Sequence, residues 1–257
     1  MSIAGHLLPF AATLLLWFAS TALLVWLVNR PAATYRRSLI GGAVAGVGGV
    51  AVIAATMSSG SAAAAYAAFA GALAVWGWQE LAFLTGAISG PRRVPATASA
   101  SQARRFREAT AAVIHHELAL AATALLLIAM SWGAANQIGA AAFALLFVLR
   151  VSAKLNIHLG VPNLSDDLLP AQLDHLKSYF GPRRMTPALL LSVLATAALA
   201  IWLGTRAFAA PAGGEAVGAS LLFALAALGA LEHLFLALPV RDGALWRWAI
   251  PARPEQA

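Results

Sequence analysis

The chain has 257 residues, of which 61% are hydrophobic and 11% are charged. A soluble domain carries about 25% charged residues, so this composition indicates an integral membrane protein. The net charge of +7 does not indicate nucleic-acid binding, because the basic residues stand in short clusters between apolar runs and form no single basic face. The absence of cysteine excludes disulfides, thiolate metal sites and covalent attachment of a c-type haem.

Seven apolar segments are each long enough to cross a bilayer as a helix, which takes about 17–25 residues. They cover residues 3–28, 38–58, 62–87, 109–132, 138–159, 186–208 and 217–239. The predicted fold is an all-α, polytopic membrane helix bundle of about seven transmembrane helices, with residues 1–257 in a single integral membrane domain. The first segment is expected to be a span, because it lacks a basic n-region and is too long for the apolar region of a signal peptide.

The second segment, residues 38–58, is rich in glycine and alanine. Gly42, Gly46 and Gly49 are spaced so that they can lie toward one neighbouring helix. Small residues let two helix backbones approach closely in a membrane. We therefore expect this segment to pack tightly against another span.

The longest loop, residues 160–185, is predicted to be cytoplasmic and to contain a short amphipathic helix. Ser165 is a suitable N-cap, and Asp166 and Asp167 would place acidic side chains in the first turn. Apolar residues then recur at helical spacing before a Gly-Pro stop; they are Leu169, Leu173, Leu176 and Phe180. Such a helix lies on the membrane surface or on the bundle.

The basic residues predict the orientation of the protein in the membrane. Fourteen of the seventeen lie on one side of a seven-span arrangement, Arg150 and Lys154 lie within a span, and Arg206 is near the opposite face. The positive-inside rule places the basic side in the cytoplasm, so we expect a periplasmic N-terminus and a cytoplasmic C-terminus. The tail, residues 241–257, resembles an interfacial anchor; it contains Trp246, Arg247 and Trp248.

Ionisable residues within the predicted spans share one depth. Arg150, Lys154 and His158 are spaced at i, i+4 and i+8, so they form one basic stripe on a helix. Lys154 and three acidic residues from other segments lie about 7–12 Å inside the cytoplasmic boundary. These acidic residues are Glu80, Glu117 and Glu232. A charge at membrane depth costs at least about 2.5–3.5 kcal/mol, so we expect these groups to face the bundle interior and to find partners there.

This cluster has several interpretations, which the sequence leaves open. One is a structural ion-pair network, in which three carboxylates face two cations and one charged histidine. Another is a metal site, for which the candidate ligands are Glu80, His116, Glu117, Glu232 and His233. No span, however, has the Glu-x-x-His spacing of carboxylate-bridged bundles, and adjacent His and Glu side chains point about 100° apart.

A third interpretation is binding of a tetrapyrrole or chlorophyll. An intramembrane histidine would be an axial ligand, Arg150 or Lys154 would bind a propionate, and Trp76 and Trp78 would suit a flat ring. A fourth is a path for protons or a solute, because intramembrane acids commonly line such paths.

Several motifs resemble those of one protein family. They are Arg150-Val-Ser-Ala-Lys-Leu-Asn156, Leu159-Gly-Val-Pro-Asn163, Trp76-Gly-Trp-Gln-Glu80, Gly90-Pro-Arg-Arg93, Ser178-Tyr-Phe180 and Leu231-Glu-His233. On these motifs the chain resembles the PuhE family of photosynthetic complex assembly proteins from anoxygenic phototrophic bacteria, over nearly its whole length. The resemblance implies a protein of the bacterial inner (intracytoplasmic) membrane, encoded with the reaction-centre H subunit and involved in reaction-centre assembly and bacteriochlorophyll supply.

The sequence and the resemblance together predict an inner-membrane assembly factor for the photosynthetic reaction centre or core antenna. It would handle bacteriochlorophyll or a precursor through the intramembrane cluster. The candidate ligand-binding residues are Trp76, Trp78, Glu80, His116, Glu117, Arg150, Lys154, Asn156, His158, Glu232 and His233. Expected partners are the lipid bilayer, reaction-centre or core-antenna subunits and other assembly factors. The alternatives are a metal-dependent membrane enzyme of pigment metabolism and a purely structural scaffold.

Overall fold

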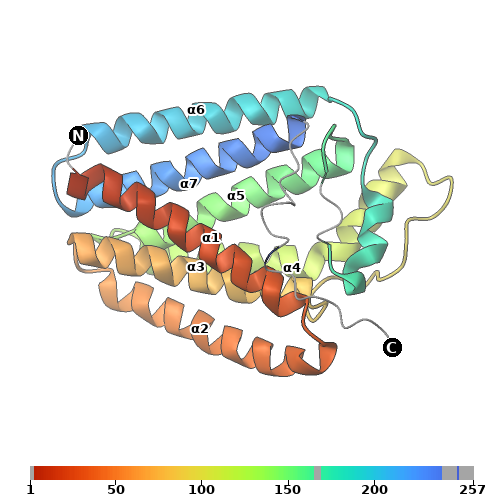
Figure 1. Ribbon diagram of the computed structural model, residues 1–257, viewed down its shortest axis with the longest axis horizontal. Helices are drawn as coiled ribbons and strands as arrows, with labels where there is room; N and C mark the ends of the chain where they lie inside the picture. Colours follow the sequence, from red (N-terminus) through yellow and green to blue (C-terminus); the bar gives the residue numbers. More distant parts are fainter. Residues whose placement is uncertain (1–2, 165–168, 239–247, 249–257) are drawn as a thin grey trace.

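The structure, a computed structural model, describes residues 3–164, 169–238 and 248, and the regular secondary structure of these residues is all helical (Figure 1). Its long helices are α1 (Leu8–Val28), α2 (Tyr35–Thr56), α3 (Ala62–Leu84), α4 (Gln102–Met130), α5 (Ile138–Leu159), α6 (Pro187–Ala209) and α7 (Gly214–Ala237). All seven are long and apolar enough to cross a membrane. The predicted all-α bundle with seven spans is therefore confirmed.

Three of the long helices, α3, α4 and α6, begin at residues whose side chains cap them. Ser61 accepts a hydrogen bond from the N–H of Ala64 and begins α3, and Ser101 accepts one from Arg104 and begins α4. Each cap satisfies one of the N–H groups that a helix start leaves unpaired. Because Ser101 caps α4, this helix starts at Gln102, seven residues before the predicted bound of 109, and its first turns carry a basic cluster.

The interior of the bundle is built mainly by α3, α5 and α7. Figure 1 shows α2 and α6 on opposite sides of the bundle, with α1 crossing over α3 and α7. The most extensive helix pairs are α2 with α3 and α6 with α7. Large side chains from the inner helices meet at the centre, where Phe69, Phe143 and Leu221 are fully buried. This core fixes the relative positions of the helices that carry the intramembrane charges.

Glycines hold α2 and α3 in backbone contact. A Cβ atom at Gly49 would lie 2.5 Å from the carbonyl oxygen of Gly71, and a Cβ atom at Gly71 would lie 2.8 Å from that of Gly49. The indole of Trp78 packs directly on Gly46, where a Cβ atom would lie 2.4 Å from the ring. The predicted close approach of residues 38–58 to another span is confirmed, and α3 is the partner.

The loop after α5 contains a short helix with a buried apolar face, as predicted. Its helical part is a 3-10 helix, η4 (Ala171–Tyr179), which lies against the bundle. Leu173, Leu176 and Tyr179 are buried against the C-terminal end of α3 and the N-terminal half of α4. The predicted N-cap at Ser165 and the acidic residues after it lie outside the described residues. The predicted anchor of the tail also lies outside the described residues, except for Trp248. The ring of Trp248 stacks on that of Phe18, with 6.0 Å between the centroids.

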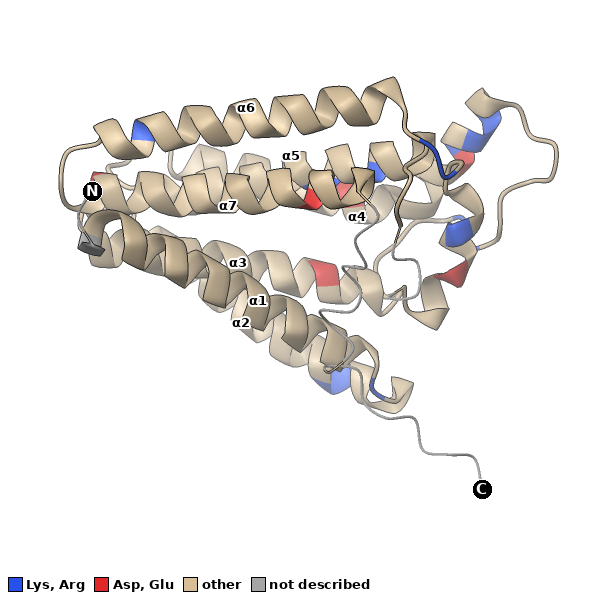
Figure 2. Ribbon diagram, turned by 45° about the horizontal axis from the view of Figure 1, so that its top comes forward, with Lys and Arg blue, Asp and Glu red and all other residues tan. Residues whose placement is uncertain are grey.

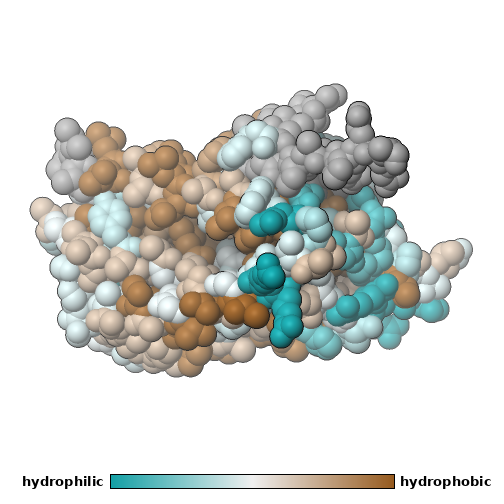
Figure 3. Space-filling model, turned by 60° about the horizontal axis from the view of Figure 1, so that its bottom comes forward, coloured by the Kyte–Doolittle hydropathy of each residue, from teal (hydrophilic) through white to brown (hydrophobic). Residues whose placement is uncertain are grey.

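Charged residues are distributed unevenly along the bundle. Figure 2 shows most of them near the end formed by the start of α4, the end of α5 and η4. At the other end, Arg206 and Glu215 are the only Lys, Arg, Asp or Glu among the described residues. On the face shown in Figure 3, hydrophobic residues cover much of the bundle and hydrophilic ones gather toward one end. This asymmetry is the one on which the predicted orientation rests.

The orientation itself remains a prediction, and reporter fusions test it. With the charged end in the cytoplasm, a fluorescent protein fused to the C-terminus is expected to fluoresce, and alkaline phosphatase fused there is expected to be inactive. A phosphatase fusion in the α6–α7 loop, residues 210–213, is expected to be active. The opposite result at both positions would contradict the predicted orientation.

Candidate functional site

Two ion pairs join the basic stripe of α5 to acidic residues on neighbouring helices. An Nη atom of Arg150 lies 3.1 Å from a carboxylate oxygen of Glu80 on α3. The Nζ atom of Lys154 donates a hydrogen bond to Glu117 on α4. Glu80 is 5% exposed, so its carboxylate is held inside the protein. The structure therefore uses the i, i+4 spacing of the two cations to bind two different helices to α5.

Phe83 and His116 complete this ion-pair cluster. The imidazole of His116 is 1% exposed and stacks on the ring of Phe83, with 4.4 Å between centroids. Its Nε2 lies 3.6 Å from the second carboxylate oxygen of Glu80. The Lys154 ammonium lies 4.8 Å from the centroid of the Phe83 ring, which is within cation–π distance. We use the name ion-pair cluster below for Glu80, Phe83, His116, Glu117, Arg150 and Lys154.

The loop after α3 inserts against α4 beside His116. The backbone N–H of His116 donates to the carbonyl of Ser89, with an N···O distance of 3.0 Å. Gly90 lies so close to α4 that a Cβ atom there would be 2.6 Å from the carbonyl carbon of Ala112. Only glycine fits such a close backbone approach. The insertion ties the position of His116 to the 86–92 loop as well as to its own helix.

Several polar atoms of the cluster are buried without a hydrogen-bond partner among the described residues. They are Glu80 Oε1, His116 Nε2, Glu117 Oε2 and Arg150 Nε. Leaving a buried polar group unsatisfied costs about 1–3 kcal/mol. A purely structural network would be expected to pair these atoms internally. Glu80 Oε1 and His116 Nε2 face each other at 3.6 Å, just beyond hydrogen-bond distance, whereas Glu117 Oε2 and Arg150 Nε leave hydrogen-bonding capacity for a bound molecule or for water.

Two cavities flank the cluster. The first, here called the η4 cavity, has a volume of about 300 Å³ and lies between the ends of α3, α4 and α5 and the η4 segment. The second, the inner cavity, has a volume of about 240 Å³ and lies between α1, α3, α5 and α7. Arg150 and Leu84 line both. Arg150 therefore contributes to the walls of both cavities.

The η4 cavity is apolar apart from a basic edge. Its apolar wall includes Phe83, Val113, Ile157, Leu169 and Phe180, and its basic edge is formed by Arg150, Lys154 and His158. Hydrogen bonds hold the η4 segment in place: the Arg92 side chain donates to the Tyr179 hydroxyl at 2.7 Å, and Arg105 donates to the backbone carbonyls of Ser178 and Phe180 on either side of Tyr179. A ligand with an apolar body and a carboxylate or carbonyl edge matches this lining.

The structure brings some of the remaining candidates to the cavities. His158 lines the η4 cavity, and its Nδ1 lies 3.1 Å from the Tyr179 carbonyl oxygen. Because a carbonyl only accepts, Nδ1 carries the proton and Nε2 keeps its lone pair. Trp76 and Glu232 line the inner cavity, and Trp76 also packs edge-on against Phe143.

Three other candidates are used in packing and internal hydrogen bonds. Trp78 covers Gly46 in the α2–α3 contact. Asn156 donates to the Ser152 carbonyl and to the Ser192 hydroxyl. The fully buried His233 has Nδ1 at 2.8 Å from the Gly229 carbonyl oxygen and Nε2 at 2.9 Å from the Ser152 hydroxyl. With both ring nitrogens engaged, His233 has no free position for a metal or a pigment.

The donor set does not fit a resident metal ion. Within the described ranges, no three His, Asp or Glu side chains are placed so that they could hold one metal. A zinc site takes at least three protein ligands, and carboxylate-bridged sites take more. In addition, Glu80 is committed to Arg150 and Glu117 to Lys154. These side chains therefore do not offer a complete ligand set for a metal ion.

Sequence reasoning missed two parts of the site. Phe83 lies three residues after Glu80 and so on the same face of α3, a signal that could have placed it beside the carboxylate. For the wall formed by the η4 segment, the apolar spacing of Leu169, Leu173, Leu176 and Phe180 predicted a helix on the membrane surface or on the bundle, but it did not indicate which helices this segment would contact. The η4 cavity, and the role of His158 in lining it, therefore emerge only from the structure.

The fold and the site define a polytopic helical membrane protein with an intramembrane ion-pair cluster between two cavities. The chain belongs to the DUF3623 family, described as a protein of unknown function, whose profile matches residues 3–257. A curated relative from Rhodobacter capsulatus is described as an uncharacterized 30.4 kDa protein in the puhA 5' region. It is 37% identical over 250 residues, which cover 95% of this chain and 91% of the relative. No solved structure matches the chain.

Proposed function

We propose that this protein is an inner-membrane assembly factor for the bacterial photosynthetic reaction centre or core antenna, and that it belongs to the PuhE family. The observation that carries this proposal is the relative in the puhA 5' region, which is similar over nearly the full length of both chains. Through the resemblance of its motifs to PuhE, the chain is linked to the reaction-centre H subunit and to bacteriochlorophyll supply. Reaction-centre or antenna subunits and other assembly factors are its proposed partners.

The proposed mechanism is the holding of a bacteriochlorophyll-type pigment, or a precursor, at the η4 cavity. A chlorin has a flat apolar face, carbonyl groups and, before esterification, a free carboxylate. The aromatic and aliphatic wall formed by Phe83, Ile157 and Phe180 suits the ring face. Arg150 and Lys154 stand where they can donate hydrogen bonds to a carboxylate or carbonyl edge.

His158 is the proposed axial ligand or hydrogen-bond partner of the pigment. It faces the η4 cavity, and the Tyr179 carbonyl fixes the tautomer that leaves Nε2 free, as is common for metal-bound imidazoles. His116 does not line either cavity. We assign it a positioning role, since it lies against both Glu80 and Phe83.

The test compares His158→Met with His115→Met. His115 is an exposed histidine on α4 that lines neither cavity, so it controls for the loss of an imidazole. We expect the wild type and His115→Met, purified in mild detergent from a phototrophic host, to carry pigment with Soret and near-infrared absorbance. His158→Met is expected to carry about tenfold less, equivalent to about 1.4 kcal/mol of binding free energy. Its cells are expected to show reduced reaction-centre or core-antenna absorbance.

Two results would count against these proposals in different ways. If deleting the gene lowers reaction-centre absorbance but the purified protein carries no pigment, pigment handling is wrong and a structural scaffold is favoured. If deletion leaves the pigmented complexes at their normal level, the assembly role itself is wrong.

A further inference from the structure

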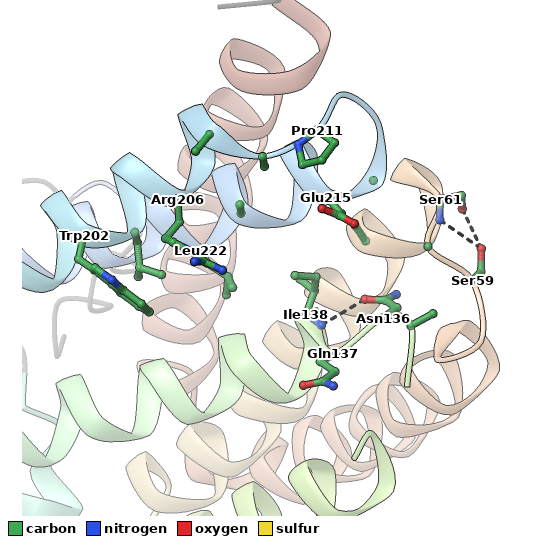
Figure 4. Close-up of a pocket in the computed structure, with 18 residues that line it drawn as sticks. Ser59, Ser61, Asn136, Gln137, Ile138, Trp202, Arg206, Pro211, Glu215 and Leu222 are labelled. Atoms are coloured by element: carbon green, nitrogen blue, oxygen red, sulfur yellow. Dashed lines mark hydrogen bonds between the residues drawn. The ribbon is translucent and has the colours of Figure 1, made fainter. Parts of the chain in front are cut away.

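A third cavity lies at the end of the bundle opposite the ion-pair cluster. It has a volume of about 720 Å³ and is lined by the turns that join α2 to α3, α4 to α5 and α6 to α7 (Figure 4). We call it the turn cavity. Because α6 ends at Ala209 and α7 begins at Gly214, these turns mark one boundary of the membrane-spanning part. The turn cavity is therefore at the level of lipid headgroups.

Two opposite charges face this cavity. Arg206, in the last turn of α6, and Glu215, in the first turn of α7, both line it, and Figure 4 shows their side chains directed into it. Each charge has the sign that its helix end favours. Within the part of the chain that the structure describes, however, neither makes an ion pair with the other or with a third residue. The cavity thus presents one cationic and one anionic group.

The rest of the wall changes from polar to apolar. Hydroxyl and amide groups of Ser59, Ser61 and Gln137 line the cavity at the connecting turns. Trp202, Leu203 and Leu222 line it where α6 and α7 face each other. Tryptophan is enriched where lipid headgroups meet acyl chains. A molecule bound here would therefore have a charged head and an apolar body.

We propose that the turn cavity binds a zwitterionic phospholipid whose headgroup carries a primary ammonium. The Arg206 guanidinium would bind the phosphate, and the Glu215 carboxylate would accept hydrogen bonds from the ammonium. The first part of an acyl chain would lie against Trp202 and Leu222. This proposal concerns the opposite end of the molecule from the pigment site and does not depend on it.

The two charges also predict which headgroups are disfavoured. The quaternary ammonium of a choline headgroup has no N–H to donate to Glu215. An anionic glycerol headgroup has no cation at all, so its phosphate would pair with Arg206 while Glu215 faced a net negative lipid. Ethanolamine is therefore expected to bind more tightly than choline or glycerol.

The experiment places the purified full-length protein in mild detergent with equal amounts of phosphatidylethanolamine, phosphatidylcholine and phosphatidylglycerol. Retained lipid is counted by native mass spectrometry. The wild type is expected to retain phosphatidylethanolamine about tenfold better than the other two. Arg206→Gln is expected to lose this retention. Glu215→Lys is expected to reverse the preference toward phosphatidylglycerol, because the site would then hold two cations.

Arg184→Gln serves as the matched control, because Arg184 is an exposed arginine at the other end of the bundle. It is expected to retain lipid as the wild type does. Arg206 and Glu215 are themselves exposed, so their variants are expected to elute as folded protein in size-exclusion chromatography. Equal retention of the three lipids by the wild type would overturn the proposal. So would unchanged retention in Arg206→Gln, or an unchanged headgroup preference in Glu215→Lys.

Discussion

Lys154→Met is expected to remove most of the folded protein from the membrane, and adding Glu117→Gln to the same chain is expected to restore a large part of it. The reason is the ion pair between the two side chains, which are 23% and 19% exposed. Removing one partner of a buried ion pair leaves the other charge uncompensated and lowers the folding stability by about 3–5 kcal/mol. That is a large fraction of the 5–15 kcal/mol by which a typical domain is stable. Removing both charges avoids most of this cost.

The second ion pair supplies the matched control. Arg150→Met should be rescued by Glu80→Gln, because these two side chains bind each other. The crossed combination, Lys154→Met with Glu80→Gln, should not recover, since it leaves both remaining charges without their partners. Folded yield is measured by fluorescence-detected size-exclusion chromatography of a fluorescent fusion. Equal recovery in matched and crossed double variants would show that the charges do not act as these pairs.

Gly49→Leu is expected to destabilise the bundle strongly, whereas Gly48→Leu is expected to leave it near the wild type. At Gly49 a Cβ atom would meet the Gly71 carbonyl oxygen at 2.5 Å, and a backbone atom cannot turn away as a side chain can. At Gly48 a Cβ atom would meet nothing within 4 Å. Overpacking of a close contact costs about 1–3 kcal/mol, and more where the backbone must move.

Because both variants introduce the same side chain at neighbouring positions of α2, they share changes in helix propensity and hydrophobicity. The two variants are compared by their unfolding temperatures in detergent. Unfolding is monitored as the loss of the monodisperse peak in size-exclusion chromatography. A lower unfolding temperature for Gly49→Leu alone would support the backbone contact between α2 and α3. Similar unfolding temperatures for the two variants would rule that contact out.

The bilayer explains why the helices could be predicted from the sequence. Backbone polar groups in hydrocarbon must be paired within the protein, so each long apolar run becomes one helix. The bounds of α5, residues 138–159, needed no correction. The helix α4 begins seven residues before the predicted apolar segment, because its cap at Ser101 precedes that segment in the chain.

The partners within the cluster could not be predicted in the same way. Periodicity shows which face of α5 carries Arg150 and Lys154, but the order of helices around that face decides which carboxylate each one meets. His116 and Glu117 are neighbours in sequence, yet one contacts Glu80 and Phe83 and the other contacts Lys154. The sequence could therefore propose the set of charged residues but not their pairing.

Arg150 lines both the η4 cavity and the inner cavity, and this has a thermodynamic consequence. If an occupant of one cavity draws the guanidinium toward itself, it changes the surroundings of any occupant of the other. Linkage then requires each molecule to alter the affinity of the second by the same factor. In a carrier with this arrangement, filling one cavity would promote or oppose emptying of the other, so that uptake and handover of cargo become parts of a single equilibrium.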